Sequence, residues 1–220
     1  MSLKAKLEAF RNGFEKQVPG DALAIMHGAT RDLRASGILN NAVGVGSTLP
    51  SFSLSNQDGT QVSSDELLAR GPLVISFFRG AWCPYCMIEL NALSDIASDI
   101  RAAGGDIVVI SPQTPQKSKA MVEKEGLDLP ILSDPGTDYA RQLGVSFVLP
   151  DALREIYGKL GGFTLPEYNG DESWRLPIPT RLIADQSGKV RYAEVDADYT
   201  VRPEPSETLA ALRGLVKAAA

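Results

Sequence analysis

The sequence has few of the residues that would indicate a disulfide-stapled or metal-binding protein. It contains only two cysteines, Cys83 and Cys86, and they are too close together to link distant parts of a fold. It contains one histidine, His27. A tetrahedral site needs four ligands, so a cysteine-only metal site could close only across a dimer. We therefore expect no metal and no other cofactor, and the cysteine spacing indicates redox chemistry.

The sequence also lacks an excess of positive charge and a long apolar run. It has 22 Lys and Arg against 27 Asp and Glu, a net charge of −5. Nucleic-acid binding depends on basic side chains that displace counterions from phosphates. No stretch approaches the roughly 20 apolar residues of a membrane helix, and residues 1–8 mix charged with apolar positions. We expect a cytoplasmic protein with neither a membrane nor a nucleic-acid partner.

Residues 1–42 predict an N-terminal extension made of a helical hairpin. In its first helix the apolar residues recur at steps of three and four, at Leu3, Leu7, Phe10, Phe14 and Val18. Pro19 ends that helix, and a second amphipathic helix follows. We favour packing of both apolar faces on the main domain. A dimerisation arm, and with it a homodimer, stays open.

Residues 43–220 predict an α/β domain with a central mixed sheet flanked by helices. Apolar strands at 73–78 and 107–110 enclose a helix, which is the pattern of a βαβ unit. Strands at 180–184 and 189–193 flank a Gly-containing turn, as expected for an antiparallel hairpin. The stretch at about 146–177 has one periodic piece, so we interpret it as an insertion with one helix.

The two cysteines lie between the strand at 73–78 and the helix that follows it. Cys83 is expected at the N-cap, with Pro84 at the first helical position. The free amides and the positive end of the helix dipole stabilise a thiolate, which is the reactive form of cysteine. We expect Cys83 to be the nucleophile. Cys86, one turn later, is placed to attack a mixed disulfide or a sulfenic acid on Cys83.

The run Ala81-Trp82-Cys83-Pro84-Tyr85-Cys86 resembles the active-site turn of the thioredoxin superfamily, and its Cys-Pro-Tyr-Cys is similar to that of glutaredoxins. Ile178-Pro179-Thr180 resembles the superfamily's cis-proline element. The resemblance implies a thioredoxin-like fold in which Pro179 is cis and lies against the cysteines. It also implies that the substrate docks on the residues around the pair, namely Arg79, Trp82, Pro84, Tyr85 and Pro179.

Other segments resemble the alkyl hydroperoxide reductase and thiol-specific antioxidant (AhpC/TSA) group, the peroxiredoxins. They are Leu49-Pro50-Ser51-Phe52-Ser53-Leu54, Ser133-Asp134-Pro135, Leu143-Gly144-Val145 and Ile183-Ala184-Asp185. The resemblance covers roughly residues 43–216. It implies an antioxidant enzyme, a thiol peroxidase that reduces hydroperoxides through Cys83. Cys86 then resolves the oxidised Cys83 as an intramolecular disulfide, and thioredoxin or glutathione reduces that disulfide.

The sequence departs from the peroxiredoxin pattern at three positions. Ser76 and Gly80 stand where typical members carry a proline and a hydroxyl residue, and Pro179 aligns with their arginine. Arg79 and Arg181 are the candidates for a replacement cation. We expect a hydroperoxide as substrate, while a disulfide reductase and a redox-switched binding module stay open as alternatives.

Overall fold

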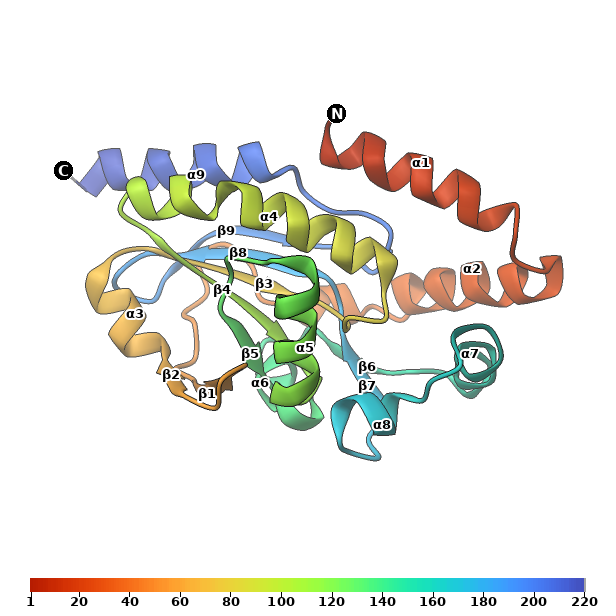
Figure 1. The fold of residues 1–220 in the computed structure, drawn as a ribbon. Coiled ribbons are helices and arrows are strands. Elements are labelled where there is room, and N and C mark those ends of the chain that lie inside the picture. Colours follow the sequence, from red (N-terminus) through yellow and green to blue (C-terminus); the bar gives the residue numbers. More distant parts are fainter. Residues whose placement is uncertain (220) are drawn as a thin grey trace.

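A seven-stranded mixed sheet forms the centre of the computed structural model, which describes residues 1–219 (Figure 1). Its strand order is β2-β1-β5-β4-β3-β8-β9. The strands are β1 (Ser53–Asn56), β2 (Gln61–Ser63), β3 (Leu73–Phe77), β4 (Asp106–Ser111), β5 (Ile131–Ser133), β8 (Thr180–Ala184) and β9 (Val190–Val195). β3, β4 and β5 are parallel, and the remaining strands join antiparallel to their neighbours. The α/β fold with a central mixed sheet is confirmed.

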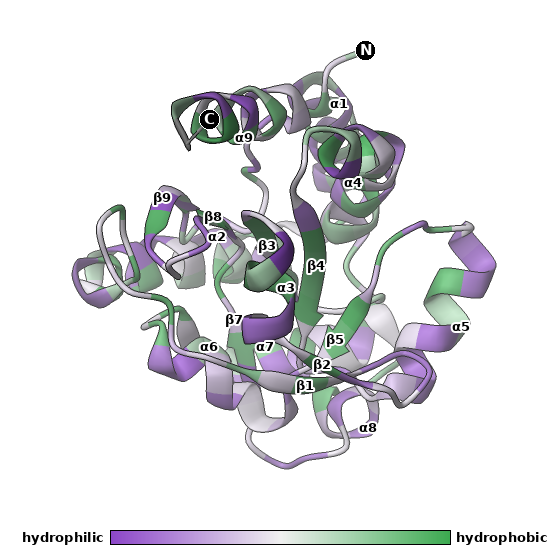
Figure 2. Ribbon diagram, turned by 90° about the vertical axis from the view of Figure 1, so that its left-hand side faces the viewer, coloured by the Kyte–Doolittle hydropathy of each residue, from purple (hydrophilic) through white to green (hydrophobic). Residues whose placement is uncertain are grey.

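Side chains of the central strands alternate between two helical layers, because successive residues of a strand face opposite sides of the sheet. Val74 packs with one cluster and Ile75 with the other. The first layer holds α4 (Pro84–Ala102), α5 (Pro115–Glu125) and α9 (Pro205–Ala219), and the second holds α3 (Ser64–Arg70) and α6 (Asp138–Gln142). β4 and β5 are strongly hydrophobic between these layers (Figure 2). A rigid, buried β3 therefore carries the cysteine turn.

The two N-terminal helices, α1 (Leu3–Glu15) and α2 (Gly20–Ala35), run in opposite directions and pack on different partners (Figure 1). α1 packs on α4, where Leu7 joins the main core, and α2 packs on α7 (Asp151–Ile156), where Met26 is buried. Glu204 accepts hydrogen bonds from the first amides of α1, at 3.0 Å from Leu3 N and 2.8 Å from Lys4 N. α1 and α2 thus pack on helices of this chain through Leu3 and Leu7 on α1 and Met26 on α2.

Residues 146–177 are more ordered than the sequence suggested, and the prediction of a single helix there was wrong. β6 (Ser146–Val148) and β7 (Arg175–Pro177) form a separate antiparallel pair. Between them lie α7, a π-helical turn (Tyr157–Gly161) and α8 (Leu165–Asn169). The one periodic piece of the sequence coincides with α7 and the π-helical turn, whereas α8, β6 and β7 are too short to produce a period. No helix within residues 1–219 is long and apolar enough to cross a bilayer.

Candidate active site

Cys83 and Cys86 sit at the start of α4, at the end of the loop that follows β3. Cys83 is the N-cap with extended backbone angles, Pro84 opens the first turn, and the Met87 amide donates to the Cys83 carbonyl at 3.1 Å. This local geometry is the one predicted from the sequence. Both thiols are free, with 2% of Cys83 and none of Cys86 exposed to solvent.

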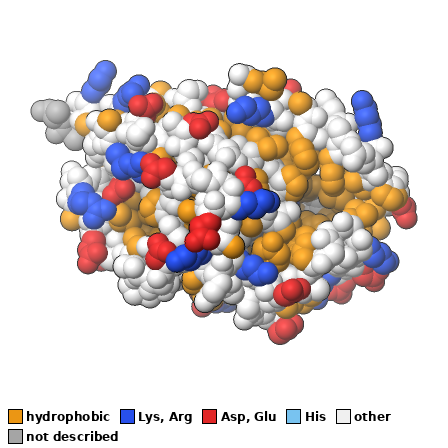
Figure 3. Space-filling model, in the orientation of Figure 1, with side chains coloured by type: hydrophobic (Ala, Val, Ile, Leu, Met, Phe, Trp, Pro, Cys, Tyr) orange, Lys and Arg blue, Asp and Glu red, His pale blue; other side chains and the backbone are white. Residues whose placement is uncertain are grey.

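Cys83 lines an apolar cavity of about 220 Å³ that opens between α1, α4 and the segment after α7. Its walls are made largely of aromatic and aliphatic side chains, among them Phe10, Phe14, Trp82, Tyr85, Tyr157 and Phe163. In Figure 3, hydrophobic side chains gather around a hollow on the side where α1, α2 and α7 meet. The N-terminal helices and residues 146–177 thus build walls around Cys83.

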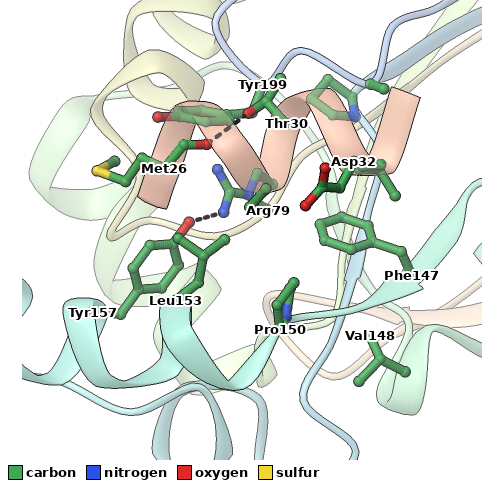
Figure 4. A pocket seen from close by; sticks show the side chains of 14 residues that line it. Met26, Thr30, Asp32, Arg79, Phe147, Val148, Pro150, Leu153, Tyr157 and Tyr199 are labelled. Atoms are coloured by element: carbon green, nitrogen blue, oxygen red, sulfur yellow. Dashed lines mark hydrogen bonds between the residues drawn. The ribbon is translucent and has the colours of Figure 1, made fainter. Parts of the chain in front are cut away.

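Arg79 is a buried cation in the wall of this cavity. Its guanidinium carbon lies 5.0, 5.6 and 4.6 Å from the ring centres of Trp82, Tyr157 and Tyr199, and it donates a hydrogen bond to the Tyr157 hydroxyl (Figure 4). Within residues 1–219 no carboxylate forms an ion pair with it, and its Nε has no hydrogen-bond partner. Aromatic faces therefore stabilise a guanidinium whose donors are available to an anion.

Trp82 occupies the space next to Gly80, one of the positions that departs from the peroxiredoxin pattern. Gly80 has φ +150°, and a Cβ built there would overlap the Trp82 indole nitrogen. The indole therefore excludes any side chain at position 80. Within residues 1–219, Trp82 Nε1 is itself a buried donor without a partner. Such groups are uncommon in folded proteins.

The surroundings of the two cysteines shift their pKa values in opposite directions. A hydrogen bond from Cys86 is the largest contribution that lowers the pKa of Cys83, to about 6, and Arg79 and Arg202 lower it further against the effect of burial. Burial raises the pKa of Cys86 well above its ordinary value, and the neighbouring Cys83 raises it further. At neutral pH the pair therefore holds one thiolate, centred on Cys83.

Behind Cys86 lies a buried ionic network that we did not anticipate from the sequence. Glu89 accepts hydrogen bonds from Arg181 with one carboxylate oxygen and from Arg202 with the other. Arg202 Nη2 lies 3.6 Å from Cys86 Sγ. Arg181, a candidate for the substrate cation, is instead engaged with Glu89 and with Thr208 Oγ1 at 3.0 Å. Arg79 is the candidate that lines the cavity of Cys83.

Sequence signals for the missed residues existed but were weak. Glu89 follows Cys86 by three positions on the inward face of α4, and a charged residue on such a face requires a buried partner. Arg202 lies among the charged residues of the run 198–204, where ion pairs between neighbouring residues are a sufficient explanation of its charge. Tyr157 belongs to the segment interpreted as an insertion, so nothing in the sequence connected it with Arg79.

Pro179 departs from the sequence prediction, because no peptide bond within residues 1–219 is cis. The chain continues extended from β7 into β8, with the Ile178 amide bound to the Val145 carbonyl at 2.7 Å. Pro179 is not among the residues that line the cavity of Cys83. It lines a neighbouring cavity of about 100 Å³ on the other side of Arg79, against Phe147 and Leu153. The prediction that Pro179 is cis and lies against the cysteines was therefore wrong.

The other predicted docking residues do surround Cys83. Pro84 is exposed at the rim, whereas Tyr85 is buried and meets the rings of Phe10 and Tyr199 edge-on at 5.0 and 5.5 Å. His27 pairs with Glu15 on the surface, away from the cysteines. Among residues 1–219, no three His, Cys, Asp or Glu side chains are grouped as a metal site would require.

Comparison with known proteins places this site in a family. The AhpC/TSA family model matches residues 45–193. The chain is 34% identical over 105 residues to peroxiredoxin Bcp of Escherichia coli K12, covering 48% of this chain and 67% of that protein. It is 29% identical over 169 residues to chloroplastic peroxiredoxin Q of Populus jackii, covering 70% and 79%. The crystal structure of peroxidoxin BcpB from Mycobacterium tuberculosis superposes with a TM-score of 0.61 at 26% identity, over 79% of this chain and 98% of that one. The chain belongs to the AhpC/TSA family.

Proposed function

We propose that this protein is a thiol peroxidase in which the Cys83 thiolate attacks a hydroperoxide. The observation that carries the proposal is the position of Cys83, at the N-cap of α4 and in the wall of a cavity that also contains the unpaired cation Arg79. With a pKa of about 6, Cys83 is largely ionised at neutral pH. The thiolate takes the terminal oxygen of the hydroperoxide and becomes a sulfenic acid as the O–O bond breaks. The alkoxide or hydroxide that leaves takes a proton from solvent and becomes an alcohol or water.

The two unpaired donors of the cavity wall are suited to hold the peroxide oxygens. Arg79 Nε and Trp82 Nε1 are both buried and have no acceptor in the part of the chain that the structure describes, and both residues border the cavity of Cys83. Negative charge develops on the leaving oxygen as the O–O bond breaks, so donors placed at that oxygen stabilise the transition state. In this proposal they replace the hydroxyl that Gly80 cannot supply.

Cys86 then resolves the sulfenic acid. Its thiol attacks Cys83, water is released, and an intramolecular disulfide forms. The short spacing along one helical turn supports this assignment, and a dithiol such as thioredoxin, or glutathione, would restore the pair. A cytoplasmic location is part of the proposal, because that compartment keeps such reductants reduced.

In this proposal residues 1–42 and 146–177 form part of the active-site cavity. Phe10 and Phe14 from the N-terminal extension, and Tyr157 and Phe163 from the insertion, supply cavity walls that the main domain lacks. The apolar lining excludes water from the thiolate, which strengthens the electrostatic effect of Arg79.

A second candidate function is protein disulfide reduction. It is favoured by the position of both cysteines in the first turn of one helix, an arrangement that exchanges disulfides without a peroxide. A redox-switched binding module is a further alternative, and it predicts slow turnover with every reductant together with a partner bound in only one redox state.

The two catalytic functions separate in a single-turnover experiment. The reduced protein is mixed with hydrogen peroxide, an organic hydroperoxide or a small disulfide, and the fluorescence of Trp82 beside Cys83 is followed in a stopped-flow instrument. Rapid oxidation by a hydroperoxide that is abolished in Cys83→Ser supports the peroxidase. Reaction with hydroperoxides no faster than that of a free thiol, together with rapid disulfide exchange, would replace it by the reductase.

A further inference from the structure

Arg202 is held rigidly against the sulfur of Cys86. Its Nε donates to Glu89, and its Nη1 donates to the backbone carbonyls of Tyr199 and Val201, both at 2.7 Å. The remaining nitrogen, Nη2, faces Cys86 Sγ at 3.6 Å. The segment that carries Arg202 runs from β9 to α9 past the first turn of α4 (Figure 1). Three of its contacts are thus fixed by other groups, and the fourth is directed at a reacting atom.

The network around Arg202 has a positive charge in excess. Arg181 and Arg202 share the single carboxylate of Glu89, and all three side chains are buried. Within residues 1–219 neither arginine forms an ion pair with a second acidic group. Burying an uncompensated charge is costly, so an anion beside it is stabilised. Besides Glu89, the anion that this arrangement can favour at Nη2 is the thiolate of Cys86.

The two sulfurs differ in access. Cys83 lines the cavity, whereas Cys86 is fully buried and lines neither this cavity nor the neighbouring one beside Pro179. The groups that face Cys86 are Cys83, the Arg202 guanidinium and the backbone of Arg79. An incoming reductant therefore meets Cys83, and the sulfur that must leave is Cys86.

We propose that Arg202 stabilises the Cys86 thiolate as it leaves during reduction of the Cys83–Cys86 disulfide, and so directs the reductant to Cys83. The inference rests on the proposed function in one respect only, namely that this disulfide forms. Glu89 is then a positioning residue, because it holds Arg202 without touching sulfur.

The chemical step is a two-electron thiol–disulfide exchange. A thiolate of a dithiol reductant attacks Cys83 Sγ, a new S–S bond forms, and the bond to Cys86 breaks. Cys86 leaves with the electron pair, and Nη2 of Arg202 donates to it. The second thiol of the reductant then attacks the reductant sulfur that is bound to Cys83. This step releases the oxidised reductant, and Cys83 leaves as a thiolate. One proton from that thiol goes to Cys86 or to solvent.

Replacement of Arg202 by two residues with similar stems tests the role of its charge. Wild type, Arg202→Met and Arg202→Lys are oxidised with diamide, so that disulfide formation does not depend on peroxidase activity. Reduction by dithiothreitol is then followed by Trp fluorescence as a function of pH. Arg202→Met leaves Glu89 paired with Arg181, and circular dichroism shows whether each variant is folded.

We expect Arg202→Met to slow reduction by about tenfold to a hundredfold, the effect of losing one charge-assisted hydrogen bond to the leaving group. Arg202→Lys should recover part of the rate, because an ammonium keeps the charge but cannot hold all four partners.

Rates within about twofold of wild type in folded Arg202→Met would overturn the proposal and leave Arg202 a structural residue. If Arg202→Met does not fold, Arg202→Gln removes the charge with a polar side chain instead, and an unchanged rate in folded Arg202→Gln overturns the proposal equally. Failure of the proposed function is seen separately. If hydroperoxides do not oxidise wild type while Arg202→Met still slows reduction of the diamide-formed disulfide, the peroxidase assignment is wrong and the role of Arg202 stands.

Discussion

The guanidinium of Arg79 donates a hydrogen bond to the hydroxyl of Tyr157, and this contact joins the loop before the reactive cysteine to the segment after α7 (Figure 4). The pair connects two parts of the chain that are far apart in sequence. It also fixes the orientation of the cation in the wall of the cavity. The position of Arg79 therefore depends on residues 146–177.

Replacing Arg79 by Met should slow oxidation of Cys83 by hydroperoxides by about tenfold to a hundredfold, because a charge-assisted contact to the developing anion is lost. Arg79→Lys should lose less. Tyr157→Phe keeps the ring and removes only the hydrogen bond, so its effect should be the smallest. Single-turnover rates at saturating pH provide the measurement. Equal rates in wild type and Arg79→Met would exclude Arg79 from the chemistry.

The rate of oxidation should depend on pH through Cys83. Since the thiolate is the reactive form and the pKa of Cys83 is lowered to about 6, the second-order rate should rise with pH, reach half its maximum near pH 6 and level off above it. In Cys86→Ala the midpoint should move to higher pH, because the hydrogen bond from Cys86 is the largest contribution that lowers this pKa. A midpoint unaffected by Cys86→Ala would contradict this account of the pair.

Stability of the reduced protein should also change with pH. The ordinary pKa of a cysteine is about 9, and that of Cys83 in the folded protein is about 6. Between these values the unfolded chain binds a proton that the folded chain does not, so the free energy of unfolding rises with pH in this window. The stabilisation is complete above about pH 9 and is lost as the pH falls through about 6.

Urea unfolding of reduced wild type and Cys83→Ser across the window measures this linkage. The serine variant lacks the titrating thiol, so its unfolding free energy should depend less steeply on pH. Parallel curves for the two proteins would show that Cys83 does not ionise in the folded state.

The N-terminal extension should contribute to the stability of the whole protein. Leu7 on α1 is 4% exposed and packs into the core beside α4, so Leu7→Ala should lower the free energy of unfolding by about 2–5 kcal/mol. Ile25 on α2 is 40% exposed, and Ile25→Ala should change it by less than about 0.5 kcal/mol. Chemical denaturation provides the comparison. A cost for Leu7→Ala as small as that for Ile25→Ala would mean that α1 does not fold with the core.

The sequence predicted those parts of the molecule that depend on local patterns. Local side-chain patterns and the preferences of Pro and Gly predicted three features. These are the two apolar strands β3 and β4, the hairpin of β8 and β9, and the N-cap position of Cys83. β3 was recognisable because five consecutive buried residues leave few alternatives to a central strand. The helix that begins at Pro84 was recognisable for the same local reasons.

Contacts between distant residues could not be predicted in this way. Arg202 meets Cys86 across 116 positions, and Tyr157 meets Arg79 across 78. No single-sequence pattern records such a pairing. Only one piece of residues 146–177 showed a helical period; α8 is too short to show one, and α3, with its Ser63 N-cap, was missed for the same reason. Pro179 shows the limit of carrying over a motif, because its peptide bond is trans and the backbone there is extended. The Ile178 amide donates to the Val145 carbonyl, and Thr180 Oγ1 donates to the Ile178 carbonyl.

The products of a single turnover test the central claim, that Cys83 attacks the hydroperoxide and Cys86 resolves it. Reduced wild type and the Cys86→Ser and Cys83→Ser variants are each treated with one equivalent of an organic hydroperoxide, with and without a sulfenic-acid trap, and are analysed by intact mass and peptide mapping. We predict a Cys83–Cys86 disulfide in wild type, a trapped sulfenic acid on Cys83 in Cys86→Ser, and no rapid oxidation of Cys83→Ser. A sulfenic acid on Cys86, or equally fast oxidation without Cys83, would contradict the account.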